Sequence, residues 1–379
     1  MSYSTCRICK SRLPASELLR LNNMPQSAQG FLTPDDVKTD KGVDLSIFEC
    51  AACGLVQANC APVSYYREVI RTNAFSTAMQ AFRAKFLHDF VSRFELKGKS
   101  ILEIGCGNGE YLDLFHNEGL ICSGTEFGEA AVEACKAKGH RVQKCFPDQP
   151  TVLLENTPFD CFATFNFLEH WPEPSLVLKS IHANTTVDAI GLVEVPNFEM
   201  ILKENLFSEF IADHLSYFTR DTLELLLRIN GFDVIESRSI WHDYILSVVV
   251  RKRPSVDVAE FAVMRCQLDC AVQAFLAKHS ESGVAIWGAG HQALAVISLL
   301  NISDKIRYVV DSAPFKQGRL TPASHLPIHP PAYLRVDPVG AVLIIAAGYS
   351  DEVLRILRTE FDSELNVAIL RENHLEEAG

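Results

Sequence analysis

The sequence has no long run of basic residues and no long apolar run, and each absence removes a class of protein. Its 379 residues carry a net charge of −12 at pH 7, whereas a phosphate-binding groove needs clustered lysine and arginine. We therefore expect no nucleic-acid partner. No stretch reaches the roughly 20 apolar residues that cross a bilayer, and "MSYSTCRICK" lacks the apolar segment of a signal peptide. A cytoplasmic protein without membrane contact is expected.

The composition and the length point to a multidomain globular protein. Hydrophobic residues make up 48% of the chain and charged residues 22%, which is typical of a soluble globular protein. A chain of this length exceeds one ordinary hydrophobic core, so two or three domains are expected.

Four of the twelve cysteines form two C-x-x-C pairs, "CRIC" and "CAAC". A tight turn lets each pair aim both sulfurs at one ion, and two such turns complete a tetrahedral thiolate site. We expect a structural zinc ion held by Cys6, Cys9, Cys50 and Cys53, contributing on the order of 10 kcal/mol to folding. The alternative is four unrelated thiols. The remaining cysteines are expected to be free, because disulfides are rare in a reducing compartment.

The stretch "KSILEIGCGNGEYLDLF" predicts a buried strand at 101–104, a glycine turn and a helix. The next predicted strand, "ICSGTEF", ends at the acidic Glu126, about 20 positions further on. Glycines let the backbone approach a ligand at a helix N-terminus, and the acid accepts hydrogen bonds from ribose hydroxyls. An α/β domain that binds a nucleotide cofactor is expected, with nicotinamide dinucleotide and S-adenosylmethionine (SAM) as the competing ligands.

The segment "E-I-G-C-G-N-G" resembles motif I of class I SAM-dependent methyltransferases. Strands predicted in "FDCFATFNFLEH" and "AIGLVEVPN", followed by an antiparallel pair in "DVIESRSI" and "YILSVVVRKR", fit the order of that fold. The resemblance implies SAM as the cofactor. The cofactor contacts that it implies are Glu103, Gly105, Gly107, Asn108, Gly109, Glu126, Phe127 and Asn166.

A second α/β unit is predicted after the helical stretch "EFAVMRCQLDCAVQAFLAKH". "GVAIWGAGHQALAVISLL" again indicates a strand, a glycine turn and a helix, and "IRYVVDSAP" places Asp311 where a ribose-binding acid would lie. Such a unit either packs against the first domain or binds a nucleotide-like ligand, and Gly288, Gly290 and Asp311 favour binding.

A zinc knuckle, a methyltransferase core and a Rossmann-like C-terminal domain together resemble the sugar C-methyltransferases of deoxysugar biosynthesis. These act on nucleotide-diphosphate 4-keto-6-deoxysugars. The resemblance covers essentially the whole chain and rests also on "EVPNFEMIL", "DHLSYFT" and "VVDSAPFKQGRLTPASHLPI". It implies a zinc-binding module at 1–65, a methyltransferase domain at 66–253 and a substrate-binding domain at 254–379.

The resemblance also implies roles for single residues. "DHLSYF" matches the family's "E-H-x-x-Y-F" signature, which makes His214 the proposed base, with Asp213 beside it. His170 falls at the family's second active-site histidine. The base would remove a proton next to a ketone, and the enolate carbon would then attack the methyl group of the cofactor. The implied substrate contacts are Tyr217, Gly288, Gly290, Asp311, Lys316 and Arg319.

The chain departs from the family at substrate-facing positions. The usual Tyr-His-Glu-His run is replaced by 211–214, Ile-Ala-Asp-His, so the tyrosine proposed as base or relay is missing there. Two alternatives therefore stay open: O- or N-methylation of another small metabolite on the same scaffold, and a zinc- and cofactor-binding protein without turnover.

A few further residues are weaker candidates. Phe75 and Ser76 could fold over the cofactor or simply begin a helix. Tyr65 and Tyr66 could form an aromatic lid or be linker packing. Sugar contacts could come from His242 and Asp243, and Glu194 could face the pocket, each set having a purely structural alternative.

Overall fold

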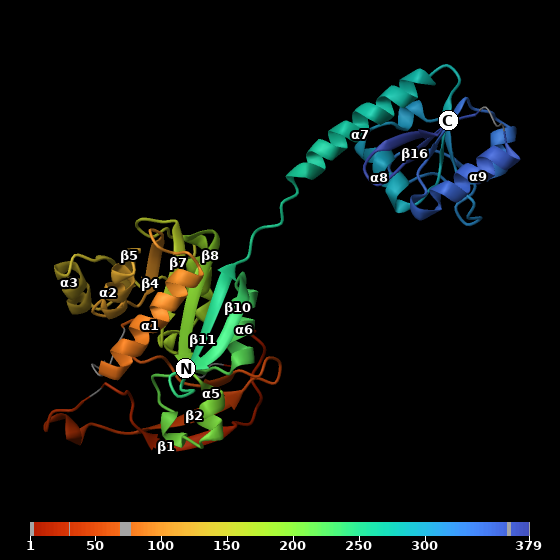
Figure 1. The fold of residues 1–379 in the computed structure, drawn as a ribbon. Coiled ribbons are helices and arrows are strands. Elements are labelled where there is room, and N and C mark those ends of the chain that lie inside the picture. The colour runs from red at the N-terminus through yellow and green to blue at the C-terminus, as the bar shows by residue number, and fades with distance from the viewer. Residues whose placement is uncertain (1–3, 30, 69–76, 362–364, 379) are drawn as a thin grey trace. The chain divides into compact units, whose positions relative to one another are not determined.

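The computed structural model describes residues 4–29, 31–68, 77–361 and 365–378. The chain divides into two compact units, residues 1–254 and 255–379 (Figure 1). No helix among the described residues is long and apolar enough to cross a membrane.

The first unit contains a small antiparallel sheet that combines three N-terminal strands with one strand from much later in the sequence. Its order is β1 (Leu19–Met24), β2 (Val43–Glu49), β3 (Val56–Ala58) and β9 (Ser216–Tyr217). In the last pairing Val56 lies opposite Tyr217 and Gln57 opposite Ser216. The N-terminal segment therefore holds the chain directly after His214.

A seven-stranded sheet forms the centre of the first unit. Its order is β10 (Phe232–Ile240), β11 (Ile245–Lys252), β8 (Thr185–Pro196), β7 (Phe159–Phe165), β4 (Ser100–Ile104), β5 (Ile121–Glu126) and β6 (Arg141–Lys144). Strands β4 to β8 are parallel, whereas β11 is antiparallel to both β8 and β10. Because β4 lies between β5 and β7, the strand order reverses there, and ligands bind at the carboxyl ends of such strands.

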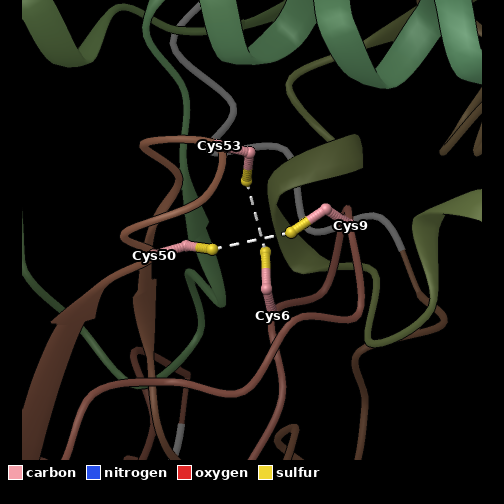
Figure 2. A group of neighbouring side chains, drawn as sticks. All are labelled: Cys6, Cys9, Cys50 and Cys53. Carbon is pink, nitrogen blue, oxygen red and sulfur yellow. Dashed lines mark hydrogen bonds between the residues drawn. The ribbon is translucent and has the colours of Figure 1, made fainter.

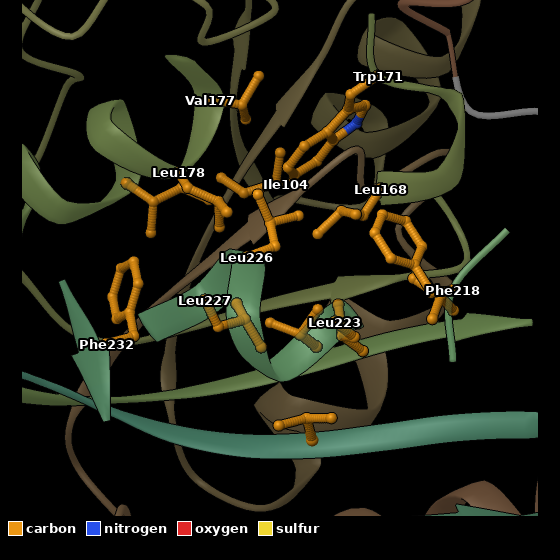
Figure 3. Packing of buried hydrophobic residues seen from close by; sticks show 14 of the residues in the cluster. Ile104, Leu168, Trp171, Val177, Leu178, Phe218, Leu223, Leu226, Leu227 and Phe232 are labelled. Atoms are coloured by element: carbon orange, nitrogen blue, oxygen red, sulfur yellow. The ribbon is translucent and has the colours of Figure 1, made fainter. Parts of the chain in front are cut away.

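Helices cover both faces of this sheet. On one face, α1 (Thr77–Arg93), α2 (Glu110–Asn117) and α3 (Glu129–Ala137) bury Phe86, Phe115 and Val132 against β4. On the other face, α4 (Pro174–Ala183) and α6 (Arg220–Ile229) pack Leu178 and Leu226 over Ile104 (Figure 3). The short helix α5 (Phe198–Lys203) packs against the small sheet.

The N-terminal segment shares a hydrophobic core with the seven-stranded sheet. Cys6, Ile8 and Leu55 belong to the same buried cluster as Trp171 and Phe218. The predicted boundary between residues 65 and 66 stays a prediction, because apolar packing is continuous across the two parts.

The second unit is a six-stranded sheet with helices on both faces. Its order is β14 (Ile328–His329), β13 (Tyr308–Val310), β12 (Val284–Trp287), β15 (Ala341–Ile344), β16 (Asn366–Leu370) and β17 (Leu375–Ala378). The described strand pairings of this sheet are parallel except that of β16 with β17, which is antiparallel. Helices α7 (Ala259–Lys278) and α8 (His291–Leu299) cover one face, and α9 (Ser350–Glu360) covers the other. Both units confirm the predicted α/β class.

Candidate active site and metal site

The four cysteines of the two C-x-x-C pairs converge at one point (Figure 2). The sulfurs of Cys6 and Cys53 lie 3.5 Å apart, as do those of Cys9 and Cys50. Sulfurs on a tetrahedron around zinc lie about 3.8 Å apart, given a Zn–S bond of about 2.3 Å. The donor set and its spacing therefore fit a closed zinc site with no position left for water.

Arg7, between the first two of these cysteines, connects the metal site to the rest of the first unit. Its side chain is 2% exposed and donates hydrogen bonds to the carbonyl oxygens of Ala58, Cys60 and Pro172. Its backbone N–H donates to the side chain of Gln57. The knuckle thus fixes the end of β3 and the turn that follows His170.

The glycine turn after β4 has the geometry of a nucleotide-binding turn. Gly105, Gly107 and Gly109 all have positive φ, at 72°, 53° and 84°, a region that side chains other than glycine adopt at a cost. Gly109 caps the start of α2, so the turn presents a helix N-terminus to a ligand. Glu103 is buried at the end of β4, one residue before Ile104.

Glu126 closes the glycine turn from the neighbouring strand. Its Oε2 accepts the N–H of Gly107 at 2.9 Å, and its Oε1 accepts those of Phe127 and Gly128 at 2.8 and 2.9 Å. The carboxylate is therefore engaged with the backbone of both βα turns. Its predicted contact with ribose stays a prediction, as does the contact of the 37% exposed Phe127 ring.

A polar cavity of about 280 Å³ opens beyond the carboxyl end of β7. Asn166 follows that strand, and the short helix η2 (Leu168–His170) comes next. Loop residues 211–214 and an N-terminal loop close the cavity from other sides. The side chains used below all line it: Tyr65, Asn166, Glu169, His170, Asp213, His214 and Tyr244.

His170 is held in a defined orientation. Its Nδ1 lies 2.8 Å from the carbonyl oxygen of Asp213, and because a carbonyl only accepts, Nδ1 carries the proton and donates it. Nε2 is then left with the lone pair. Burial lowers the pKa of His170, which favours this neutral tautomer.

His214 lies against His170 in an edge-to-face arrangement, with ring centroids 4.9 Å apart. Burial, together with the neighbouring His170, lowers the pKa of His214 to about 3. The ring is therefore neutral near pH 7, with a lone pair available to accept a proton. The structure thus brings together the two histidines that the sequence singled out.

Asp213 forms hydrogen bonds on two sides. Its backbone carbonyl bonds to His170, and its carboxylate bonds to the N-terminal segment. Its Oδ1 accepts the phenol of Tyr65 at 2.5 Å, and its Oδ2 accepts the N–H of Ala28 at 2.7 Å. Burial and this carboxylate raise the pKa of Tyr65. The sequence left Tyr65 undecided between a lid and linker packing; in the structure Tyr65 lines the cavity, and its hydroxyl donates to Asp213 and accepts the N–H of Gln29.

Glu169 is a cavity residue that was not predicted from the sequence. The side chain is 2% exposed, lines the cavity, and has its pKa raised to about 8 by burial. The only sequence signal was an acidic residue directly before His170, a position that is ordinary in a surface turn.

The weaker candidates lie in different surroundings. Glu194 is fully buried in an ion pair with Arg83, at 2.6 Å, so it does not face the cavity. Tyr217, one of the implied substrate contacts, is buried and does not belong to the cavity lining; its hydroxyl accepts the N–H of Ile211 and donates to the carbonyl oxygen of the same residue, so its substrate contact stays a prediction. His242 and Asp243 have positive φ in the connection between β10 and β11. Phe75 and Ser76 lie outside the described residues.

In the second unit, a cavity of about 470 Å³ lies at the carboxyl ends of the central strands and is lined by Gly288, Gly290, Asp311 and Lys316. Gly288 has φ of 117°, and a Cβ there would approach the carbonyl oxygen of Ile345 to 2.3 Å. Arg319 is exposed and is not part of the cavity lining.

Asp311 is fully engaged within this unit. Its carboxylate accepts the N–H of Ala289 at 2.7 Å, the N–H of Ala313 at 2.8 Å and the ammonium of Lys316 at 2.8 Å. A ribose contact by Asp311 would have to add to these bonds, and it stays a prediction.

Family models match two parts of the chain. Residues 79–237 match the model described as "Methyltransferase domain", and residues 258–367 match the "C-methyltransferase C-terminal domain". Together the two models cover more than half of the sequence. The zinc-knuckle segment lies outside both.

Among curated proteins, the chain is similar to the C-methyltransferase NovU of Streptomyces niveus, with 26% identity over 224 residues, 51% of each chain. It is also similar to a ubiquinone biosynthesis O-methyltransferase of Pseudomonas syringae, 32% identical over 97 residues, which are 24% of this chain and 41% of that protein. The chain thus spans about half or less of the length of these relatives.

Among solved structures, magnesium protoporphyrin IX methyltransferase of Synechocystis matches 50% of this chain and 91% of its own, with 15% identity and a TM-score of 0.38. The fold assignment does not rest on this structural similarity. It rests on the strand order of the seven-stranded sheet. The chain thus carries a methyltransferase domain followed by a C-methyltransferase C-terminal domain, and it is similar to a C-methyltransferase over about half its length.

Proposed function

We propose that the protein is a SAM-dependent methyltransferase that methylates a carbon next to the keto group of a nucleotide-linked sugar. The observation that carries the proposal is the neutral histidine pair, His170 and His214, in a polar cavity at the switch point of the sheet. The C-methyltransferase C-terminal domain supports carbon as the acceptor.

His214 is proposed as the base that removes the proton next to the keto group. Its ring is neutral and turned toward the cavity, as a proton acceptor requires. His170 lies beside His214 and is kept in place by its hydrogen bond to the carbonyl oxygen of Asp213. Asp213 is proposed as a positioning residue, because its carboxylate bonds to Tyr65 and Ala28 and its carbonyl to His170.

Bound SAM supplies the methyl group as an electrophile on a positively charged sulfur. The glycine turn and Glu126 are proposed to hold it, with Asn166 at the edge of the same cavity. A carbanion and a cation lose their charges as they react, so a site that excludes water favours the step. The burial of Asp213, Glu169 and Tyr217 around the histidines provides such a site.

Zinc is proposed as a structural ion held by the four converging cysteines. It would fix Arg7 and β3, and through β9 the loop that carries His214. The second unit is proposed to bind part of a nucleotide-sugar in its own cavity, where the ammonium of Lys316 would contact an anionic group in addition to Asp311.

The second candidate is O- or N-methylation of another small metabolite. The isoleucine at 211, where the family carries tyrosine, favours it. Against it, Tyr65 lines the cavity from another segment, with its hydroxyl bonded to Asp213 beside the histidines.

A paired-substrate assay separates the two candidates. Radiolabelled SAM would be incubated with a nucleotide-linked 4-keto sugar and with the same sugar reduced to the 4-hydroxyl. We expect label transfer to the keto sugar alone, because only a ketone acidifies the neighbouring C–H bond. Equal transfer to the reduced sugar would favour an oxygen acceptor, and label in neither sugar would overturn the proposed substrate class.

A further inference from the structure

One buried carboxyl group in the cavity has no part in the mechanism described so far. Glu169 lies on η2 directly before His170 and is 2% exposed. Its backbone carbonyl accepts the N–H of Leu215 at 2.9 Å, which ties η2 to the loop carrying His214. Its side-chain Oε2 has no hydrogen-bond partner among the described residues.

The surroundings of Glu169 are polar but contain few charges. Its Oε1 lies 3.8 Å from Nε2 of His170, and donor atoms of Glu169, His170 and His214 all lie within 4.8 Å of one another. The other titratable groups around the cavity are Tyr65, Tyr66, Glu68, Asp213 and Tyr244. Asp213 is engaged with Tyr65, and Tyr244 donates to Glu209, so the described contacts give Glu169 no neutralising cation.

A buried carboxyl without a cation stays protonated, and burial raises the pKa of Glu169 to about 8. The neighbouring His214 is shifted the opposite way, to about 3. Two adjacent groups whose pKa values are driven apart in this manner are the usual form of an acid and base pair in an active site.

The weakness of the base makes such an acid necessary. A histidine of low pKa gains little from taking a proton, so it can remove a carbon-bound proton only if the developing negative charge is strongly stabilised. That charge develops on the carbonyl oxygen of the substrate, where a preorganised hydrogen-bond donor has a large effect on rate. Among the residues that the structure describes, no lysine or arginine side chain of this unit lines the cavity.

We propose that Glu169 is a catalytic residue that, as a neutral carboxylic acid, donates a hydrogen bond to the carbonyl oxygen of the substrate. This inference rests on the proposed function. The C–H bond next to the carbonyl breaks, the proton goes to His214, and the electron pair forms an enolate whose oxygen is hydrogen-bonded by Glu169. The enolate carbon then bonds to the methyl group, the S–CH₃ pair returns to sulfur, the carbonyl re-forms, and Glu169 keeps its proton throughout.

The experiment isolates enolate formation from methyl transfer. Wild type and variants would be incubated in D₂O with S-adenosylhomocysteine, which has no methyl group to give, and a nucleotide-linked 4-keto-6-deoxysugar. Deuterium uptake at the carbon next to the ketone is followed by NMR from pH 6 to pH 10. Binding of S-adenosylhomocysteine, measured by calorimetry, checks that each variant is folded.

In wild type, we expect exchange to fall about tenfold per pH unit above pH 8, as Glu169 loses its proton. Glu169→Gln keeps a donor that does not ionise, so it should lose about tenfold at pH 7 and stay level through pH 9. Glu169→Leu should lose about 100-fold or more at pH 7, within the range seen for lost oxyanion donors. Glu173→Gln, at an exposed glutamate four positions further on, is the matched control and should behave as wild type.

Two results would overturn the inference while leaving the proposed function intact. One is an alkaline decline in Glu169→Gln identical to that of wild type. The other is a second equivalent of bound metal in wild type that Glu169→Gln lacks, because Glu169 would then be a ligand with its histidine neighbours rather than an acid. Wild type that exchanges no deuterium at any pH would instead remove the proposed function itself.

Discussion

The two units each have a glycine turn that bonds to an acidic residue. In the first unit the turn follows β4 and bonds to Glu126, and in the second it follows β12 and bonds to Asp311. Each acid accepts a backbone N–H of its turn, from Gly107 at 2.9 Å and from Ala289 at 2.7 Å. In the second unit, Lys316 also pairs with the acid at 2.8 Å. The three hydrogen bonds described above for Glu126, by contrast, come from backbone N–H groups.

The cavities beyond the two turns differ more than the turns do. The first is lined by Glu169, His170 and His214, three titratable groups whose pKa values burial has shifted. The second is lined by Trp287, Val353 and Ile356 beside the paired Asp311. From this difference we expect the cavity of the first unit to carry the chemistry and the cavity of the second to bind a ligand.

The largest effect is expected from removing a cysteine of the proposed zinc site, and we expect it to be confined to the first unit. Cys50→Ser should abolish stoichiometric zinc and cost on the order of 10 kcal/mol of folding free energy at the knuckle. Metal analysis and hydrogen exchange by mass spectrometry would measure this. Peptides from β3 and β9 should lose protection while those from β12 to β16 keep it.

Cys266→Ser, at an exposed cysteine of α7, is the control and should change neither quantity. Unchanged protection of β9 from hydrogen exchange after zinc loss would show that the knuckle does not hold the loop that carries His214.

The next largest effect is expected at the histidine pair. His214→Ala should lower kcat by about 10²- to 10⁴-fold, the range for a lost general base, and His170→Ala by less, because His170 is proposed to orient rather than to accept the proton. Steady-state kinetics at fixed SAM would measure both. His116→Ala on the exposed side of α2 serves as the reference, and a His214→Ala enzyme with full turnover would show that the base is misplaced.

A smaller effect, on the free energy of unfolding, is expected when Glu169 is replaced by glutamine. Its folded-state pKa of about 8 lies above the usual unfolded value of about 4.3. The wild type therefore loses stability as pH rises from about 4 toward 8, and Glu169→Gln does not. Denaturant unfolding should give the variant an advantage of at least about 1 kcal/mol at pH 8 and almost none at pH 4. An advantage independent of pH would mean that Glu169 is already ionised in the folded protein.

The smallest effect is expected at Lys316 in the second unit. The ammonium is partly exposed and Asp311 keeps two backbone donors, so Lys316→Met should cost less than about 1 kcal/mol of stability. It should weaken binding of a nucleoside diphosphate, measured by calorimetry, without changing kcat at saturation. A large loss of kcat with stability unchanged would place chemistry in the second unit. It would contradict the expected difference between the two cavities.

The sequence predicted the parts whose signals are local. A strand, a glycine turn and a helix lie within about 20 residues in each unit, and the two C-x-x-C pairs each fit one turn. His170 and His214 could be singled out because their neighbours carry a resemblance.

The surroundings of the histidines could not be predicted in the same way. Tyr65 reaches Asp213 only because β3 pairs with β9 across about 160 residues of sequence. Glu169 is buried only because the loop before β9 covers η2 through the bond from Leu215. In the sequence alone, both residues look like ordinary polar positions in linkers or turns.

The most direct test of the central claim is the position of the transferred methyl group. The protein would be incubated with SAM carrying a ¹³C-methyl group and a nucleotide-linked 4-keto-6-deoxysugar, and the product examined by carbon–proton NMR. We predict a ¹³C-methyl group bonded to the ring carbon next to the ketone. A ¹³C-methyl group bonded to oxygen or nitrogen, or no labelled sugar at all, would contradict the account.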